Sequence, residues 1–297
     1  MTRSVPQSVP LSVLQNRHTV FVDLWGDRDT TSTLTVLSWN VNRRKSAWQD
    51  IKRFGADVVL LQEATGSGLP KKPDFAVIEP PTDNWTIQNG GGAHGTAIAV
   101  MNSNLDFTAL TPVPLGFSSQ GTIASSHPGQ FSVVKLKVGK KDAYLISIYG
   151  IIKYDYADGA LHRAISDITP LLESGAEVLV AGDLNSFRGY SISGSDHAVE
   201  RHQALFDRFS LLGLDCIGPF STSGSLANCP CGDIEKCDHV HTYRHMNRDG
   251  GRAFQNDYVL ATKGLRERLV SCKALTDQDP ELWNLSDHAP IEVVLNL

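Results

Sequence analysis

The sequence predicts an α/β fold, because short apolar runs typical of buried strands alternate with segments of helical period. Residues 34–41 and 57–63 are two such runs, and residues 47–54 between them form an expected helix. Residues 158–173 carry apolar side chains at helical spacing, and residues 177–185 follow as another buried strand. This order of elements gives parallel or mixed strands with helices on the outer faces of the sheet.

Composition bounds the class of protein. The chain has 297 residues, 41% of them hydrophobic, which is enough for a substantial core. A formal charge of -5 argues against broad cationic adhesion to nucleic acid or membranes, although a local basic patch could still steer an anionic substrate. No apolar run reaches the ~18 residues that a membrane span needs, and residues 1–15 lack the apolar region of a secretory signal. We therefore expect a cytoplasmic protein without a membrane span.

One domain is expected over residues 34–297, after an N-terminal arm over residues 1–33 with one strand at residues 19–25. Neither an internal repeat nor a long linker divides the chain. Residues 221–251 form a Cys/His-rich insertion without periodicity, and long loops of this kind are usually functional or held by a metal. The oligomeric state is left open.

Polar side chains stand at the ends of several predicted strands or in the adjacent turns. Carboxylate and amide oxygens are hard ligands that suit Mg²⁺ or Mn²⁺, and a histidine beside an aspartate can be oriented as an acid or base. The set holds few nucleophiles and many oxygen ligands, so it indicates metal-assisted attack by water on a phosphate. Its members are Asn40, Glu63, Tyr149, Asp183 with Asn185, Asp257, and Asp287 with His288.

Five short motifs occur in order along the chain, each at a predicted strand end. They are Ser38-Trp39-Asn40-Val41, Leu61-Gln62-Glu63, Gly182-Asp183-Leu184-Asn185, Asn256-Asp257-Tyr258 and Ser286-Asp287-His288-Ala289-Pro290. With them the chain resembles the endonuclease/exonuclease/phosphatase superfamily, which has the deoxyribonuclease-I-like fold, over residues 34–297. The resemblance implies a four-layer sandwich, in which two mixed β-sheets pack face to face with helices on the outer faces. The strand pattern alone does not separate this fold from an ordinary three-layer sheet.

The resemblance also implies roles for the metal and the attacking water. Glu63 resembles the principal ligand of a Mg²⁺ or Mn²⁺ ion, assisted by Asn40 and Asp287. Asp183 and Asn185 resemble the pair that positions or activates the water and holds the phosphate.

His288, oriented by Asp257, resembles the histidine that contacts the scissile phosphate, and Tyr149 stands where relatives carry a Tyr or His near that group. Arg43 and Arg44 follow the strand that ends near Asn40 and either contact an anionic substrate or belong to a solvated face. In many relatives a basic and an aliphatic residue precede the aspartate that matches Asp257, whereas Gln255 and Asn256 do so here.

The function implied is that of a metal-dependent phosphoesterase, most specifically a nuclease that hydrolyses phosphodiester bonds in DNA or RNA. Nucleic acid is then the expected partner. One alternative is a phosphatase or phosphodiesterase acting on a small phosphorylated molecule or a lipid head group. Another is a non-catalytic binding protein on the same fold.

The insertion adds a second set of candidate ligands. Thiolate and imidazole are the groups that Zn²⁺ prefers, and a structural zinc would order a loop that lacks apolar contacts. The Cys-x-Cys spacing is irregular for such a site, so unligated thiols or a local disulfide stay open as alternatives. The candidate ligands are Cys229, Cys231, Cys237, His239 and His241, with His245 nearby in sequence.

Overall fold

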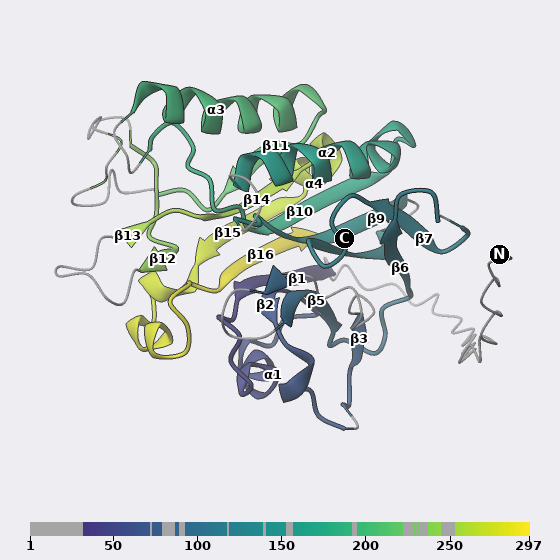
Figure 1. Ribbon diagram of the computed structural model, residues 1–297. Helices are drawn as coiled ribbons and strands as arrows, with labels where there is room; N and C mark the ends of the chain where they lie inside the picture. Colours follow the sequence, from purple (N-terminus) through teal and green to yellow (C-terminus); the bar gives the residue numbers. More distant parts are fainter. Residues whose placement is uncertain are drawn as a thin grey trace, which may run out of the picture. The chain divides into compact units, whose positions relative to one another are not determined.

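The structure is a computed structural model. It describes residues 32–71, 73–78, 87–88, 93–117, 119–138, 141–152, 157–191, 195–221, 229, 231, 237–244 and 253–297. A compact unit spans Ser32–Leu297 (Figure 1). Residues 1–31 of the expected N-terminal arm, with its strand at residues 19–25, lie outside the described residues, and Thr33 already begins the first described strand.

The first sheet has the strand order β15-β16-β1-β2-β5-β3, and β4 pairs with β5. It is mixed, because β1 runs parallel to β2 and antiparallel to β16. The strands are β1 (Thr33–Asn40), β2 (Val58–Ala64), β3 (Ala76–Ile78), β4 (Ile87–Gln88), β5 (Ala93–Val100), β15 (Leu269–Ala274) and β16 (Ile291–Asn296).

The second sheet has the order β11-β14-β10-β9-β8-β6-β7. It is mixed as well, because β10 runs parallel to β9 and antiparallel to β14. The strands are β6 (Phe107–Pro114), β7 (Thr122–Ser125), β8 (Phe131–Val138), β9 (Lys141–Tyr149), β10 (Glu177–Asp183), β11 (Asp215–Gly218) and β14 (Asp257–Ala261), while β12 (Tyr243–Arg244) and β13 (Ala253–Phe254) form a separate pair.

Helices cover the outer faces of both sheets, so the four-layer sandwich is confirmed. Leu161 and Ile165 of α2 pack with Val180 in one core cluster, on the second sheet. Trp48 and Ile51 of α1 and the 3₁₀ turn that follows it pack on the first sheet. Figure 1 shows α2 and α3 together over β10 and β14. The helices are α1 (Ala47–Asp50), α2 (Ala157–Glu173), α3 (Asp196–Leu211) and α4 (Lys263–Glu267), with 3₁₀ turns at Ile51–Phe54, Gly66–Gly68, Leu275–Asp277 and Pro280–Asn284.

The inner faces of the two sheets share one core. Along β1, successive side chains point alternately to this core and to the outer, helix-covered face. Leu34 and Val36 belong to the core between the sheets, whereas Leu37 and Trp39 pack on the helix side. Because side chains alternate with a period of two, Asn40 continues the inner series. The strand therefore carries a buried amide between the sheets at its carboxyl end.

The same alternation applies to three strands of the second sheet. Asp183, Tyr149 and Asp257 each continue an inner series and are buried, and Asp183 pairs directly with Tyr149 on one side and Asp257 on the other. Buried polar groups from both sheets thus meet at one end of the sandwich, near β12 and β13 (Figure 1). The apolar members of the inner series are Leu179 and Ala181 in β10, Leu145 in β9, and Val259 and Ala261 in β14.

Among the described residues, none of the helices is both long enough and apolar enough to cross a lipid bilayer.

Candidate active site

Asp183 lies at the centre of the buried polar group. Its Oδ2 accepts hydrogen bonds from Asn40 Nδ2 at 2.9 Å and Asn185 Nδ2 at 3.2 Å, and its Oδ1 accepts the backbone N–H of Asn185 at 2.9 Å. Asn185 itself has a left-handed backbone, with φ 47°. Burial raises the pKa of Asp183 to about 7, although the nearby His288 opposes the shift.

His288 and Asp257 form a buried pair beside Asp183. The imidazole Nδ1 lies 2.9 Å from Asp257 Oδ2, and Nε2 lies 3.7 Å from Asp183 Oδ2. The indole of Trp39 donates to the His288 carbonyl at 3.0 Å, which fixes the backbone there. Burial lowers the pKa of His288, but the carboxylates of Asp257 and Asp183 outweigh it and raise that pKa to about 10. An imidazolium with one N–H directed at Asp257 and the other toward Asp183 is the favoured form.

Glu63 reaches this group through a break in its strand. Val58 and Leu60 face the inner core, so simple alternation would place Glu63 on the outer face. The register of β2 against β5 shifts between Leu61 and Ala64, and Glu63 has a left-handed backbone with φ 49°. An irregularity of this kind re-aims a side chain.

The Glu63 carboxylate is held on both oxygens. Tyr149 donates its hydroxyl to Oε1 at 3.0 Å, and Arg43 Nε lies 3.2 Å from Oε2. Burial and the Glu63 charge raise the pKa of Tyr149 well above its ordinary value, so its hydroxyl stays protonated. Tyr149 therefore acts as a hydrogen-bond donor across the two sheets.

Asn40 joins the two carboxylates. Its Nδ2 lies 2.9 Å from Asp183 Oδ2 and 3.5 Å from Glu63 Oε1. Its Oδ1 accepts the backbone N–H of Asn42 at 2.9 Å, which identifies the orientation of the amide. The predicted use of Asn40 as an oxygen ligand would require Oδ1 to bind an ion with its second lone pair, because Nδ2 is the atom that faces the carboxylates.

The site opens toward Glu63 and Arg43. The side chains of Asp183 and His288 are 1% and 6% exposed, whereas those of Glu63 and Arg43 are 17% and 34% exposed. Two carboxylates, Asp183 and Glu63, approach the same amide nitrogen and so lie near each other. Hard anionic oxygens gathered in this way suit a divalent cation such as Mg²⁺ or Mn²⁺. The donor set present fits such an ion.

Two predicted residues lie at the edge of the group. Arg44 donates its guanidinium to the carbonyls of Asn284 and Leu285, so it is fixed to the segment before Asp287. Asp287 receives a hydrogen bond from Ser286 Oγ at 3.5 Å and lies outside the tight cluster of Asp183, Asp257 and His288. Its charge nevertheless contributes to the raised pKa of His288.

Several residues that support the site were not predicted from the sequence. Gln62 donates to Ser147 Oγ at 2.9 Å and so joins the two sheets below the site, a role that alternation along β2 could have predicted. Thr242 Oγ1 accepts the backbone N–H of Asp257 at 3.0 Å, and the Tyr243 ring lies 4.7 Å from the His288 ring between centroids. Thr242 and Tyr243 come from the insertion without periodicity, where no sequence signal marks them.

The described part of the insertion holds a second cluster. The ligand atoms of Cys229, Cys231, Cys237 and His239 all lie within 4.8 Å of one another, and His241 does not belong to the group. His245 lies outside the described residues. All five cysteines of the chain are described, and each is present as a thiol, so the local disulfide is not formed in this structure.

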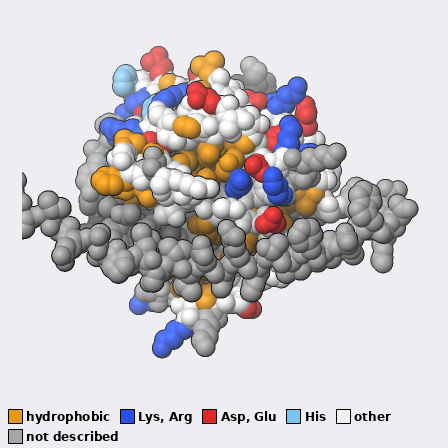
Figure 2. Space-filling view, turned by 90° about the vertical axis from the view of Figure 1, so that its right-hand side faces the viewer, with side chains coloured by type: hydrophobic (Ala, Val, Ile, Leu, Met, Phe, Trp, Pro, Cys, Tyr) orange, Lys and Arg blue, Asp and Glu red, His pale blue; other side chains and the backbone are white. Residues whose placement is uncertain are grey.

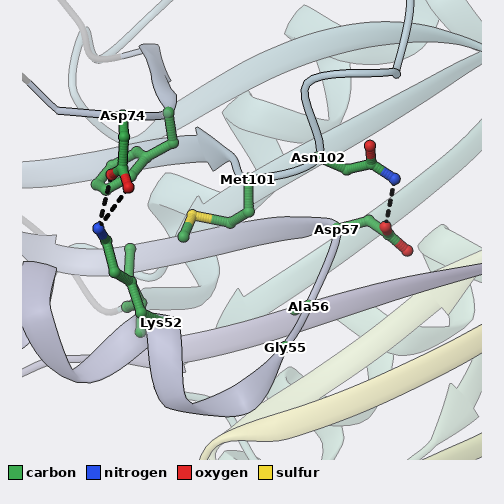
Figure 3. A pocket seen from close by; sticks show the side chains of 9 residues that line it. Lys52, Gly55, Ala56, Asp57, Asp74, Met101 and Asn102 are labelled. Carbon is green, nitrogen blue, oxygen red and sulfur yellow. Dashed lines mark hydrogen bonds and ion pairs between the residues drawn. The ribbon is translucent and has the colours of Figure 1, made fainter.

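A separate pocket of about 340 Å³ lies at the opposite end of β2 from Glu63 (Figure 3). Its charged side chains have partners, since Lys52 pairs with Asp74 at 2.6 Å and Asn102 donates to Asp57 at 2.7 Å. Asp57 also accepts the backbone N–H of Thr35 at 2.8 Å. These contacts tie the start of β2 to its neighbours, which is a structural task.

Comparison with solved structures gives matches over most of the chain. The endonuclease domain of TRAS1, a telomere-specific non-LTR retrotransposon, is 18% identical with a TM-score of 0.59, covering 89% of this chain and 99% of that one. An AP endonuclease from Archaeoglobus fulgidus is 19% identical with a TM-score of 0.54 over 89% and 100% of the two chains. The catalytic domain of Xenopus laevis APE2 is 14% identical with a TM-score of 0.62 over 89% and 92%. At these identities the likeness establishes the fold.

The family was found by a different comparison. A comparison with curated proteins gave no match. The model of the endonuclease/exonuclease/phosphatase family, however, matches residues 37–288. This range contains four of the five motifs in full and the last motif up to His288, without its final residues Ala289 and Pro290. The chain therefore belongs to the endonuclease/exonuclease/phosphatase family.

Proposed function

We propose that this protein is a metal-dependent nuclease that hydrolyses phosphodiester bonds in DNA or RNA by in-line attack of water. The observation that carries the proposal is the approach of Asp183, Glu63 and the paired His288 to one another around Asn40, from both sheets. Support also comes from the solved structures with this fold, which include a retrotransposon endonuclease domain and AP endonucleases.

The metal site of the proposal centres on Glu63, which is more accessible than Asp183 and Asp257. Asn40 and Asp287 are its predicted neighbours. When bound, Mg²⁺ or Mn²⁺ would offset negative charge on the phosphate. Arg43, which contacts Glu63 Oε2, stands at the opening where an anionic substrate would enter.

Asp183 is proposed as the base that takes a proton from the attacking water. Its pKa of about 7 lies near the operating pH, which is the condition for efficient general base catalysis. Asn40 and Asn185 hold its carboxylate, and Asn185 Nδ2 also donates to the Gly150 carbonyl at 3.1 Å, so the orientation is fixed before substrate binds. The new bond forms between the water oxygen and phosphorus as the ester bond on the opposite side breaks.

His288 is proposed to stabilise the charge that develops on the phosphate oxygens. Asp257 holds Nδ1–H, which leaves Nε2–H directed into the site. A preorganised cationic donor in a buried site interacts with developing charge far more strongly than it would in water. Tyr149 keeps Glu63 in place through its hydroxyl.

A substrate panel tests the proposal. Plasmid DNA, single-stranded DNA, DNA with an AP site, RNA, small phosphomonoesters and a phosphorylated lipid head group are each incubated with Mg²⁺, with Mn²⁺ and without added metal. We expect metal-dependent cleavage of at least one nucleic acid. Hydrolysis of the small phosphates alone would support the alternative of a small-molecule phosphatase. Loss of all activity in every arm, with the fold intact, would leave a non-catalytic binding protein.

Variants locate the activity. Asp183→Asn and His288→Gln should each lower kcat by at least about 100-fold, because each removes a group placed in the reaction. Asp57→Asn, in the pocket of Figure 3, is the matched control and should keep kcat within about threefold. Loss of activity in Asp57→Asn with full activity in Asp183→Asn would place the chemistry at the wrong end of β2 for this proposal.

A further inference from the structure

The Cys/His cluster of the insertion has the spacing of a metal site. His239 Nδ1 lies 3.5 Å from Cys229 Sγ and 3.3 Å from Cys237 Sγ, and Cys231 Sγ lies in the same group. Zinc bonds of about 2.0–2.3 Å directed to the corners of a tetrahedron place neighbouring ligand atoms roughly 3.4–3.8 Å apart. The cluster therefore has nearly the dimensions of a tetrahedral zinc shell.

The tautomer of His239 is set by a contact on the far side of its ring. Nε2 lies 2.7 Å from the Arg188 carbonyl oxygen, which can only accept, so Nε2 carries the proton. In that form Nδ1 presents a lone pair to the thiols. A histidine that ligates a metal through one nitrogen commonly donates to a carbonyl through the other.

Further contacts hold the cluster on the segment that follows β10. The Tyr190 ring packs edge-on against the His239 ring at 4.8 Å between centroids, and Asp238 forms an ion pair with Arg188. The Asp238 carbonyl accepts the backbone N–H of Ser221 at 2.7 Å. These contacts therefore hold the ligands in place, although the insertion has no apolar periodicity of its own.

We propose that Cys229, Cys231, Cys237 and His239 bind one structural Zn²⁺ ion. Three thiolates and an imidazole are soft and borderline ligands, which select zinc over the hard ions expected near Glu63. Four protein ligands leave no open position for a substrate or water, which is the arrangement of structural rather than catalytic zinc. His241, two residues beyond His239, is not a ligand.

The ion would connect the insertion to β10 and β14, two of the strands that carry residues of the candidate active site. Arg188 and Tyr190 follow Asp183 in the chain, and the Tyr190 hydroxyl accepts the backbone N–H of Gln255 at 3.0 Å, two residues before Asp257. Zinc binding is independent of whether the protein is a nuclease, because metal content is measured without any substrate.

Zinc content of the full chain tests the proposal. The protein is purified under reducing conditions without added zinc, dialysed against buffer with Mg²⁺ and no zinc, and analysed by elemental mass spectrometry. We expect about one zinc per chain. Replacement by Co²⁺ should produce the thiolate charge-transfer absorption and the visible bands of a tetrahedral site. His239→Gln and Cys237→Ser should each lower zinc content at least fivefold and lower the melting temperature.

Matched controls distinguish the cluster from its neighbours. His241→Gln lies in the same loop, and Cys272→Ser removes a thiol of β15 outside the cluster, so both should retain the zinc of the unmodified chain. Equal zinc loss in His241→Gln and His239→Gln would overturn the ligand set. Absence of zinc together with no tetrahedral Co²⁺ spectrum, or a disulfide within the cluster found by mass spectrometry, would overturn the site. If Cys237→Ser does not fold, the Co²⁺ spectrum of the unmodified chain and His239→Gln still decide the question.

Discussion

Asp183 combines near-complete burial with a negative neighbour. Desolvation and the charge of Asp257 both raise its pKa, and the charge of His288 together with the hydrogen bonds from Asn185 and Asn40 offsets only part of that rise. The ionised form that the proposed reaction needs is therefore the form that the folded protein tolerates least. A residue of this kind makes the active site a source of instability, which is a known trade-off in enzymes.

This conflict predicts how stability depends on pH. Because the pKa of Asp183 is raised in the folded state, its stabilisation is complete below pH 3.8 and is lost as pH rises to about 7. The asparagine side chain of the variant Asp183→Asn cannot titrate. As pH rises through this window, the free energy of unfolding of the variant should therefore increase relative to that of the unmodified chain, by up to about 4 kcal/mol. Urea unfolding in Mg²⁺-free buffer at several pH values measures the difference. Asp207→Asn, an exposed change on α3, gives the baseline, and parallel curves for Asp183→Asn would contradict the assignment.

A second pH prediction concerns His288. The Asp257 carboxylate raises the pKa of His288 against the effect of burial, so Asp257→Asn should lower it. If the imidazolium acts on the phosphate, the alkaline limb of kcat/KM should then move at least about one unit toward lower pH. The profile is measured on whichever substrate the panel identifies. An unmoved alkaline limb would show that the charge of His288 does not limit the reaction.

Arg43 and Arg44 are neighbours in sequence with different surroundings. Arg43 lies at the opening beside Glu63, whereas Arg44 is bound to carbonyls of another segment. If the substrate is a nucleic acid, Arg43→Ala should raise KM and lower the slope of log KM against log salt by about one, the value for one phosphate contact. Arg44→Ala should lower the melting temperature and leave the salt slope unchanged. Equal salt slopes in both variants and the unmodified chain would remove Arg43 from the substrate site.

At the scale of the residue, alternation along a strand explains for which site residues the sequence could predict the face of the sheet. Asn40, Tyr149 and Asp183 stand after the inner-core residues of their strands and Asp257 stands before them, each in the same period of two, so their common face could be read from the order of residues. Glu63 breaks the rule, since its left-handed backbone and the register shift in β2 are not encoded by a glycine or another local signal. The family resemblance could identify Glu63 as a site residue, but alternation along β2 could not predict the direction of its side chain.

At the scale of the elements, a polar joint connects β2 to β9 below the site. Gln62 donates to Ser147 Oγ, and Ser147 Oγ donates to the Leu61 carbonyl at 2.8 Å, all of them buried between the sheets. The joint fixes the spacing of the strands that carry Glu63 and Tyr149. A buried hydrogen-bonding group that loses its partner costs roughly 1–3 kcal/mol.

Ser147→Ala should therefore lower the free energy of unfolding by about 1–3 kcal/mol, because it removes the buried hydroxyl that bonds both the Gln62 amide and the Leu61 carbonyl. Ser210→Ala, on the exposed side of α3, is the control and should change stability by less than about 0.5 kcal/mol. Chemical denaturation of the two variants gives the comparison. Equal stability of both would mean that water replaces the joint without loss.

The elements that the sequence did not predict share a physical cause. β6 lies near the edge of its sheet, is only partly buried and contains two prolines, so it lacks the apolar run of a central strand. β15 is likewise an edge strand with a mostly half-exposed pattern. α3 begins at Asp196, and its first turns carry polar residues that resemble a loop. Partial burial weakens the periodic signal in each case.

At the scale of the whole unit, the layer arrangement was predictable only in part. The apolar strands and the two helical segments indicated an α/β fold, but which strands share a sheet depends on contacts between residues far apart in the chain. β9 pairs with β10 across α2, while β14 and β11 complete the same sheet from later in the sequence. Such pairing is not encoded by local period, and here the family resemblance supplied it.

Charge at this scale bears on the choice of substrate. The chain carries a net charge of -5, so a polyanion gains little from long-range attraction. On the face shown in Figure 2, the Lys and Arg side chains that are coloured lie among Asp and Glu and next to apolar side chains, rather than in a continuous basic strip. That face lies away from β12 and β13, near which the site residues meet, so the expectation for the substrate rests on the net charge alone. With a negative net charge, binding of a nucleic acid would depend on local contacts such as Arg43.

The pairing of β1 with β16 has a consequence for biosynthesis. Thr33 lies opposite Asn296, so the first strand of the unit finds its antiparallel neighbour only when the last strand has been synthesised. A chain emerging from the ribosome must hold β1 with one edge unpaired until then, and His288 arrives with that final segment. The proposed hydrolytic centre is thus completed by the last part of the unit to be translated, and a nascent chain is inactive until that part has emerged.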